Sequence, residues 1–203
     1  MKKIIPLFSL LLILSCQKKN TGEKKILNIR LENRVSSFDP LYANEFYVAQ
    51  EVAKVFEGLL EFDYKKRPYE LIPNLAVKMP EVSQDGLTYT FTIHSGVKFH
   101  PDKCFKNENE RELSASDVAF TIKRMEDPKS NASGWWMLDG KIAGLNQWRA
   151  QKKHDYNTEI DGIKVLGKDK ITFKLVKPFP QFLYTFAMPI SYIVSEKIVN
   201  CYK

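Results

Sequence analysis

The stretch "AVKMPEVSQDGLTYTFTIHSGVKF" at residues 76–99 carries the clearest local pattern of this 203-residue chain. Tyr89, Phe91 and Ile93 alternate with threonines, and this period of two is typical of a strand with one buried face. The Asp-Gly pair just before the alternation is favoured in tight turns. The stretch therefore predicts a half-buried strand that follows a turn.

Two other segments have patterns that specify an element. "LSASDVAFTIKRMEDP" at 113–128 predicts a helix that is capped by Ser114, with Asp117 as the acidic partner of a capping box and Pro128 as its end. "DGIKVLGKDKITFKLVKPFP" at 161–180 predicts a hairpin, because apolar residues alternate on both sides of a Gly-Lys-Asp-Lys turn.

Three weaker patterns complete the outline. "ILNIRLE" at 26–32 alternates as a strand does, and "EFYVAQEVAKVFEGLLEF" at 45–62 has an apolar stripe that predicts a helix ending near Gly58. A further helix is predicted to start at Ser195. Because strands and helices interleave along the chain, we predict an α/β fold.

The first sixteen residues, "MKKIIPLFSLLLILSC", are typical of a lipoprotein export signal. The apolar core at 4–14 is shorter than the roughly 20 residues that span a bilayer, and two lysines precede it. Cys16 follows a small residue, as in a bacterial lipobox, where diacylglycerol is attached to the thiol. We therefore predict a signal peptide at 1–15, lipidation of Cys16, a tether at 16–25, and a protein exported and held by lipid at the membrane, facing the periplasm or the cell exterior. The alternative is an ordinary secretory signal with a chance cysteine.

Composition argues for a folded, exported protein. Hydrophobic residues make up 44% of the chain and aromatic residues 12%, which indicates a packed core. The formal net charge falls from +7 to +5 once Lys2 and Lys3 leave with the signal. The remaining lysines are mixed with acids rather than gathered on one helix face, so we expect a solvated surface and no nucleic-acid partner.

Histidine and cysteine spacing provides no metal or redox motif. His94, His100 and His154 do not stand at ligand spacing, so no metal site and no cofactor are predicted. Cys104 and Cys201 are far apart and belong to no framework pattern. Two free thiols are therefore favoured over a disulfide.

Several stretches, in order and spacing, resemble one family, the oligopeptide- and dipeptide-binding proteins of bacterial ABC importers (solute-binding protein family 5). The matching stretches are "SFDP" (37–40), "VFEGLLEFD" (55–63), "PNLAVKMPEVSQDGLTYTFTIHSGVKFH" (73–100), "LSASDVAFTIKRMEDP" (113–128) and, more weakly, "DKITFKLVKPFPQFL" (169–183). The segment at 101–112 departs from the family as an altered, lengthened loop, and His94 stands where the family usually has a basic residue.

The resemblance implies a clamshell of the type II periplasmic-binding-protein class, with peptide enclosed between two lobes. Residues 26–203 would form only the N-terminal part of the first lobe, which would be incomplete, and the second lobe would be absent. The chain is therefore expected to be a truncated fragment. Implied partners are a peptide ligand and the membrane permease and ATPase subunits of an ABC importer.

The resemblance also implies ligand contacts. In family members the loop after "S-x-D-P" lies along the cleft, which maps to Asn44, Glu45 and Phe46, with contacts largely through backbone groups. An aromatic residue after the helix-ending Asp-Pro maps to Trp135. The structural alternatives are that Glu45 and Phe46 only begin a helix, with Phe46 packed inward, and that Trp135 and Trp136 fill a core.

Three other functions remain as alternatives. The same fold could bind a nickel chelate, a sugar or an opine. An exported hydrolase using Ser95 with His94 or His100 is disfavoured, because no G-x-S-x-G or HExxH motif occurs and no catalytic residue is predicted. A surface adhesin or signalling lipoprotein is a further, secondary role.

Overall fold

The computed structural model describes residues 26–30 and 33–202. The chain divides into two units, Met1–Glu32 and Asn33–Lys203. In the first unit, residues 26–30 have no regular secondary structure, and Leu27 and Ile29 are exposed. The strand predicted at 26–32 is therefore wrong over its described part, because alternation makes a strand only where another backbone pairs with it. Among the described helices, none is long and apolar enough to cross a membrane.

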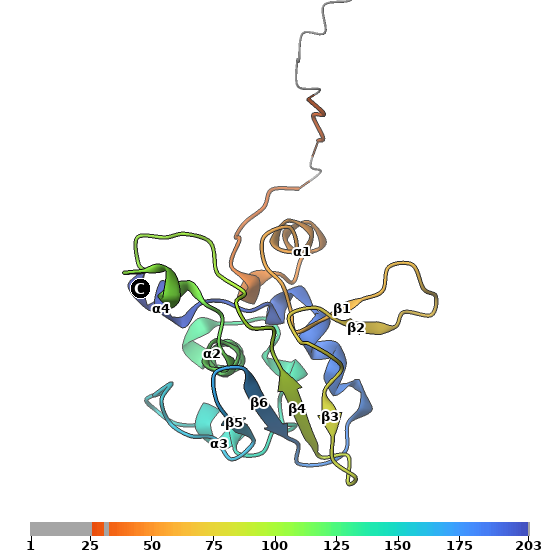
Figure 1. The fold of residues 1–203 in the computed structure, drawn as a ribbon, viewed down its shortest axis with the longest axis vertical. Coiled ribbons are helices and arrows are strands. Elements are labelled where there is room, and N and C mark those ends of the chain that lie inside the picture. The colour runs from red at the N-terminus through yellow and green to blue at the C-terminus, as the bar shows by residue number, and fades with distance from the viewer. Residues whose placement is uncertain (1–25, 31–32, 203) are drawn as a thin grey trace, which may run out of the picture. The chain divides into compact units, whose positions relative to one another are not determined.

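A four-stranded antiparallel sheet forms one side of the second unit (Figure 1). Its strand order is β3-β4-β6-β5, with bounds of Glu81–Val82 for β3, Thr88–Thr92 for β4, Ile163–Val165 for β5 and Lys170–Lys174 for β6. Tyr89 pairs with Phe173 and Phe91 with Ile171 across the central strands. The predicted half-buried strand and the predicted hairpin are both confirmed, and their apolar faces lie on the same side of the sheet.

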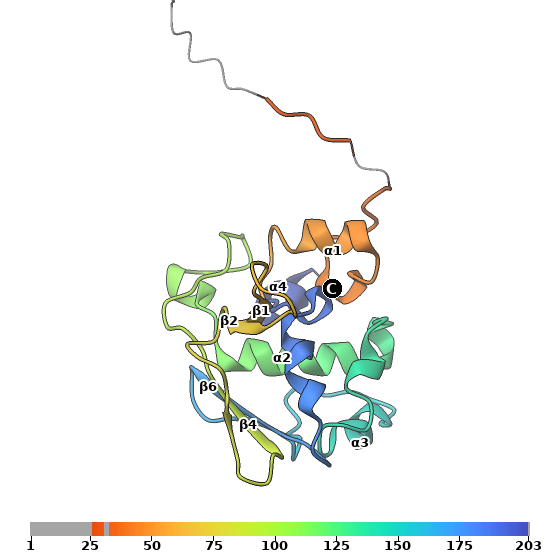
Figure 2. The ribbon, with the colours of Figure 1, turned by 90° about the vertical axis from the view of Figure 1, so that its right-hand side faces the viewer.

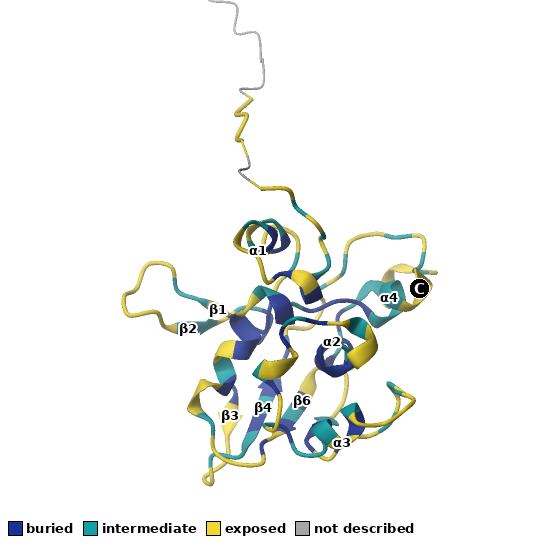
Figure 3. Ribbon diagram, turned by 180° about the vertical axis from the view of Figure 1, so that it is seen from behind, coloured by how far each residue is buried: buried dark blue, intermediate teal, exposed yellow. Residues whose placement is uncertain are grey.

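Helix α2 (Ala115–Glu126) packs against β5 and β6 and is buried along most of its length (Figure 3). The carboxylate of Asp117 accepts hydrogen bonds from the backbone N–H of Ser114 at 3.0 Å and from its hydroxyl at 2.7 Å. The helix ends just before the Asp127-Pro128 pair. The predicted capping and the predicted end are confirmed.

Four phenylalanine rings fill the space between the sheet and the 3₁₀ helix η6 (Pro180–Ala187). The centroid of Phe186 lies 4.8 Å from that of Phe91 and 5.1 Å from those of Phe173 and Phe182. Such tilted and edge-on contacts suit the charge distribution of aromatic rings. This cluster fixes η6, and hence the segment that follows it, against the sheet.

The helix predicted within 45–62, with its end near Gly58, is shorter than expected, and this prediction is wrong beyond Val52. Helix α1 spans Phe46–Val52, and the chain then forms strand β1 (Leu60–Phe62), which pairs with β2 (Leu71–Pro73). A β-carbon at Gly58 would lie 2.4 Å from the carbonyl oxygen of Phe186. Gly58 is therefore a point of close backbone approach and not a helix end.

Several short elements complete the unit. Helix α4 (Glu196–Cys201) begins at its cap Ser195, as predicted, and packs against α2 (Figure 2). Helix α3 spans Leu145–Arg149. The other 3₁₀ helices are η2 (Pro40–Tyr42), η3 (Glu108–Arg111), η4 (Pro128–Ser130), η5 (Trp135–Met137) and η7 (Pro189–Ser191).

A disulfide joins Cys104 and Cys201, whose α-carbons lie 6.1 Å apart. The prediction of two free thiols is therefore wrong. The fold places the loop at 101–112 beside α4, a proximity that a separation of 97 residues in sequence does not reveal. The same two segments are joined by the Tyr202 hydroxyl, which donates to the Asp102 carboxylate at 3.2 Å, and by an ion pair between Lys197 and Glu110.

Candidate functional site

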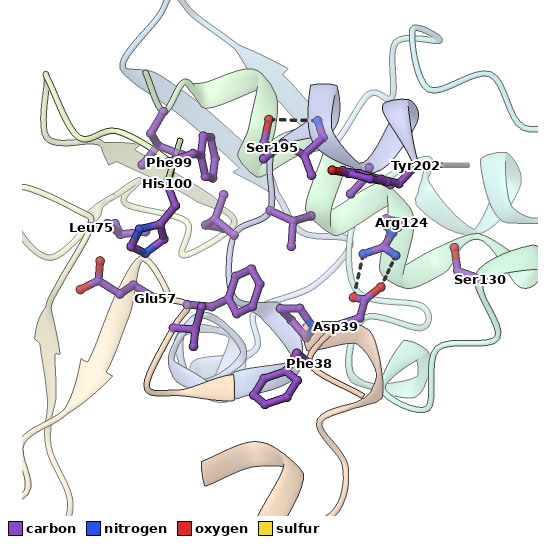
Figure 4. Close-up of a pocket in the computed structure, with 18 of the residues that line it drawn as sticks. Phe38, Asp39, Glu57, Leu75, Phe99, His100, Arg124, Ser130, Ser195 and Tyr202 are labelled. Carbon is purple, nitrogen blue, oxygen red and sulfur yellow. Dashed lines mark hydrogen bonds and ion pairs between the residues drawn. The ribbon is translucent and has the colours of Figure 1, made fainter. Parts of the chain in front are cut away.

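The second unit contains two hollows that differ in size and chemistry. The larger hollow has a volume of about 950 Å³ and lies between the loop at 38–40, the segment at 55–57, α2 and the segment at 193–202 (Figure 4). Most of the side chains around it are apolar, and Phe38, Val55 and Tyr202 are exposed. This surface offers a large area for apolar contact, beside charged side chains such as Glu57, Lys98 and Lys129.

One pair of charged groups in the larger hollow, Arg124 and Asp39, satisfies itself. The Arg124 guanidinium donates to the Asp39 carboxylate, with Nη1–Oδ1 at 2.9 Å and Nη2–Oδ2 at 2.5 Å (Figure 4). Asp39 also accepts from the backbone N–H of Leu41 at 3.1 Å and so caps η2. This bidentate pair holds the "SFDP" loop against α2, so the role of both residues is structural.

The smaller pocket is polar and has a volume of about 460 Å³. Its walls come from the start of the unit, from the loop after α2 and from the end of α3. They are formed by Tyr42, Asn44, Asp127, Pro128, Asn131, Ala132, Ser133, Trp135 and Arg149. Two residues predicted separately as ligand contacts, Asn44 and Trp135, thus line the same pocket.

The other two predicted contacts lie elsewhere. Glu45 and Phe46 do not line the pocket, because Glu45 is the N-terminal cap of α1 and Phe46 is its first residue. The Phe46 side chain is 68% exposed, so the alternative of an inward-packed Phe46 is wrong. Trp135 and Trp136 are 38% and 63% exposed, so the alternative that they fill a core is also wrong.

Arg149 is the charged residue of the pocket that sequence reasoning missed. Its guanidinium lies 4.4 Å from the ring centroid of Trp135, within the range of a cation–π contact. Its Nη1 donates to the backbone carbonyl of Glu126 at 2.8 Å and lies 3.5 Å from the carboxylate oxygen Oε2 of the same residue. No motif marks the segment "NQWRA", so the sequence provided no signal for this residue.

Glu126 lies behind Arg149, at the last turn of α2. Its side chain is 0% exposed, and neither carboxylate oxygen forms a hydrogen bond with any residue that the structure describes. Burial raises the pKa of Glu126 to about 7, against the opposing effect of Arg149. The Ser133 hydroxyl oxygen is likewise buried without a hydrogen-bond partner among the described residues.

Asp127 lines both hollows and is held by its neighbours. It accepts from the Tyr156 hydroxyl at 2.8 Å and from the backbone N–H of Lys129 at 2.9 Å, and His154 Nδ1 lies 3.4 Å from it. Burial and this hydrogen bond to Asp127 raise the pKa of Tyr156, so its hydroxyl stays a donor at neutral pH. The wall between the two hollows is therefore a fixed polar network.

The residues considered for hydrolysis do not form a site. Ser95 lies with Gly96 in an exposed turn, and Gly96 has a φ of +77°. His100 borders the larger hollow, whereas His94 does not. Within the part of the chain that the structure describes, no group of three or more His, Cys, Asp or Glu residues is placed to hold a metal ion.

Comparison with solved structures identifies the class of fold. The peptide-bound OppA of Listeria monocytogenes aligns with a TM-score of 0.70 and 23% identity, over 87% of this chain and 32% of that one. At this identity the likeness concerns the fold alone. The fold is that of the type II periplasmic-binding proteins, as predicted, and the chain forms an α/β part of it.

Sequence comparison identifies the family. Residues 70–201 match the model of the bacterial extracellular solute-binding proteins, family 5, and the chain belongs to that family. The dipeptide-binding protein DppE of Bacillus subtilis is 30% identical over 190 residues, which cover 91% of this chain and 31% of that protein. The glutathione-binding protein GsiB of Pectobacterium atrosepticum is 30% identical over 175 residues, covering 86% and 28%. The chain thus spans about a third of the length of these relatives.

Proposed function

We propose that this chain is part of the extracytoplasmic peptide-binding component of an ABC importer, and that its smaller pocket is one wall of the peptide site. The observation that carries the proposal is the meeting of Asn44 and Trp135, which come from distant parts of the chain, in one polar pocket. Membership of family 5 and the similarity to a dipeptide-binding protein support it.

The pocket suits binding and not chemistry. An importer must accept many peptide sequences, so its affinity has to come from groups that all peptides share. The exposed face of Trp135 can stack on a peptide plane, and the Asn44 amide can donate to or accept from a peptide group. Glu45 and Phe46 follow Asn44 directly, and we propose that they contribute backbone groups beside the pocket.

One wall alone binds weakly, because it cannot enclose the ligand or exclude water. We expect short peptides to bind this chain in about the millimolar range, several orders of magnitude below a site that closes on both sides. Titration of the ¹⁵N-labelled chain with mixed tripeptides should shift the backbone amide signals of residues 42–44 and the Trp135 indole signal. Micromolar or tighter binding would contradict the one-wall interpretation, and the absence of any shift in the pocket would contradict the proposed site.

Trp135→Ala and Trp136→Ala form a matched pair for this test. Trp135 lines the pocket and Trp136 does not, although both are exposed neighbours in one short helix. We expect Trp135→Ala to weaken peptide binding about tenfold, as loss of an aromatic contact does, and Trp136→Ala to leave it unchanged. Equal effects of the two changes would argue against the pocket.

We also propose that Cys16 is lipidated and that the chain is anchored at the outer face of the membrane, where it meets a permease and its ATPase. This proposal rests on the sequence "LSC" at 14–16, because the signal at 1–15, Cys16 and the tether at 16–25 lie outside the described residues. Radiolabelled palmitate should be incorporated by the wild-type chain and not by Cys16→Ser. Equal labelling of both would contradict lipidation at this residue.

A solute other than an ordinary peptide is the second candidate. One relative is named a glutathione-binding protein, so similar chains do not all share one cargo. The same titration with a nickel chelate, a sugar and an opine separates the possibilities. A response to one of these that exceeds the response to tripeptides would favour the alternative.

A further inference from the structure

The guanidinium of Arg149 is held in place and yet keeps donors to spare. Its position is fixed by the Trp135 ring on one side and by the hydrogen bond from Nη1 to the Glu126 carbonyl on the other. In the described part of the chain, no residue accepts a hydrogen bond from its Nε or Nη2. The side chain is 24% exposed and lines the smaller pocket. A preorganised fork of this kind matches the two oxygens of a carboxylate.

The charges around the pocket leave Arg149 with room for an anion. Glu126 is buried behind the guanidinium, within reach of the charges of Asp139 and Lys141 as well, and its raised pKa leaves it only partly ionised near neutral pH. The acid that lines the pocket, Asp127, is occupied by Tyr156, by a backbone N–H and by its contact with His154. Arg124 differs, because its guanidinium donates two hydrogen bonds to the Asp39 carboxylate and so serves a structural role.

We propose that Arg149 forms a carboxylate subsite in the smaller pocket, with the Asn44 amide and the Ser133 hydroxyl as neutral donors beside it. This inference rests on the proposed function and adds a substrate class to it, namely peptides that present a carboxylate at this wall. The carboxylate can be the peptide's own C-terminus or an acidic side chain, since both offer the same pair of oxygens.

The test follows the indole N–H signal of Trp135 in the ¹⁵N-labelled full chain, held in mild detergent, and uses four probes. Trialanine carries a C-terminal carboxylate, trialanine amide carries none, Ala-Glu-Ala amide carries one on its side chain, and sodium acetate supplies the carboxylate alone. We expect trialanine to bind about tenfold or more tightly than its amide, as a charge-assisted bidentate contact implies. Tighter binding of Ala-Glu-Ala amide than of trialanine identifies the side chain as the source, and the reverse identifies the C-terminus.

Variants assign the effect to the residue. Arg149→Gln should abolish the preference for the acid over the amide, and Arg149→Lys should retain part of it, because lysine keeps the charge without the fork. Arg67→Gln is the matched control, since Arg67 also stacks on an aromatic ring, Tyr69 at 4.1 Å, but lines neither hollow. Should Arg149→Gln fail to fold because Glu126 loses its counter-charge, the double variant Arg149→Gln/Glu126→Gln removes both charges together.

The outcomes separate this inference from the function on which it rests. Equal binding of trialanine and its amide by the wild-type chain overturns the carboxylate subsite and leaves peptide binding intact. A response to acetate that disappears in the Arg149 variants, with no response to any peptide, supports the subsite and overturns the peptide site. Retention of the acid preference in Arg149→Gln also overturns the subsite.

Discussion

The two hollows of this chain teach different lessons about recognition. The larger one has about twice the volume of the smaller, but Arg124 and Asp39 satisfy each other there, and most of its lining side chains are apolar. The smaller one contains an arginine with donors to spare, an exposed tryptophan and an asparagine. The volume of a hollow limits how much of a ligand it can cover, whereas hydrogen-bonding groups without a partner determine which ligand it selects. Four changes can break or sharpen this contrast.

The largest effect is expected from removing the disulfide that holds α4, a helix whose residues Ile198 and Val199 line the larger hollow. Replacing both Cys104 and Cys201 by serine opens a loop of 97 residues, which corresponds to up to about 4.7 kcal/mol of unfolding free energy in the chain-entropy picture. Urea denaturation of the wild type and of the double variant measures the loss. Peptide titration of the smaller pocket should be unchanged, and a change there would show that the two hollows are coupled.

The next effect concerns Glu126, behind the smaller pocket, and depends on pH. Its pKa is about 7 in the folded chain against an ordinary 4.5, so between these values the folded state keeps a proton that the unfolded state releases. The free energy of unfolding should therefore fall as pH rises through this window, by about 3 kcal/mol at most.

Glu126→Gln removes that group and should flatten this part of the pH profile. We expect the variant to match the wild type at about pH 4.5 and to be more stable above about pH 7, as measured by denaturation at several pH values. A wild-type profile that is already flat, or an unchanged slope in the variant, would contradict the raised pKa of the buried Glu126 carboxyl.

A smaller loss is expected from Arg124→Ala in the larger hollow. The Asp39 carboxylate would lose its bidentate partner while remaining partly buried, which should lower the free energy of unfolding by about 2 kcal/mol. Denaturant titration measures it, with the exposed ion-pair variant Lys78→Ala as a control that should change stability very little. If Arg124→Ala weakened carboxylate binding as Arg149→Gln is expected to, the division of tasks between the two arginines would be wrong.

The smallest effect on stability is expected from Phe38→Ser at the mouth of the larger hollow. The Phe38 side chain is exposed, so its loss should change the free energy of unfolding by only about 0.5 kcal/mol. The binding of a hydrophobic dye should change more clearly, and we expect Phe38→Ser to weaken it. Val77→Ser is the control, because Val77 is exposed but lies outside the hollow. Equal dye binding by both variants would mean that the hollow is no apolar patch.

Patterns that are complete within a few residues predicted the structure well. The strand around Phe91, the cap formed by Ser114 and Asp117, and the hairpin each depend on neighbours in sequence, so the sequence contains all the information that they need. The alternation at 26–30 lacked a partner strand, and Gly58 served the approach of a distant carbonyl instead of ending a helix. Those two features depend on the rest of the fold, which periodicity does not describe.

The candidate site shows the same division. Family resemblance pointed to Asn44 and Trp135, and they line one pocket, whereas Glu45 and Phe46 do not. Arg149 and Glu126 could not be predicted, because their meeting depends on how α3 lies against the end of α2. The sequence does not show whether the guanidinium of an arginine is fully hydrogen-bonded, as in Arg124, or keeps donors without a partner.

The covalent link between the loop at 101–112 and α4 also bears on where the chain can mature. Cytosolic reductants keep thiols reduced, whereas the periplasm and the cell exterior allow disulfides to form. A copy retained in the cytosol would hold α4 to its neighbour only through the Lys197 ion pair, the Tyr202 hydroxyl and its packing on α2. On the proposal that the chain is exported, passage across the membrane is a step of assembly as well as of delivery, and the native cross-link should be sought in material recovered from outside the cytosol.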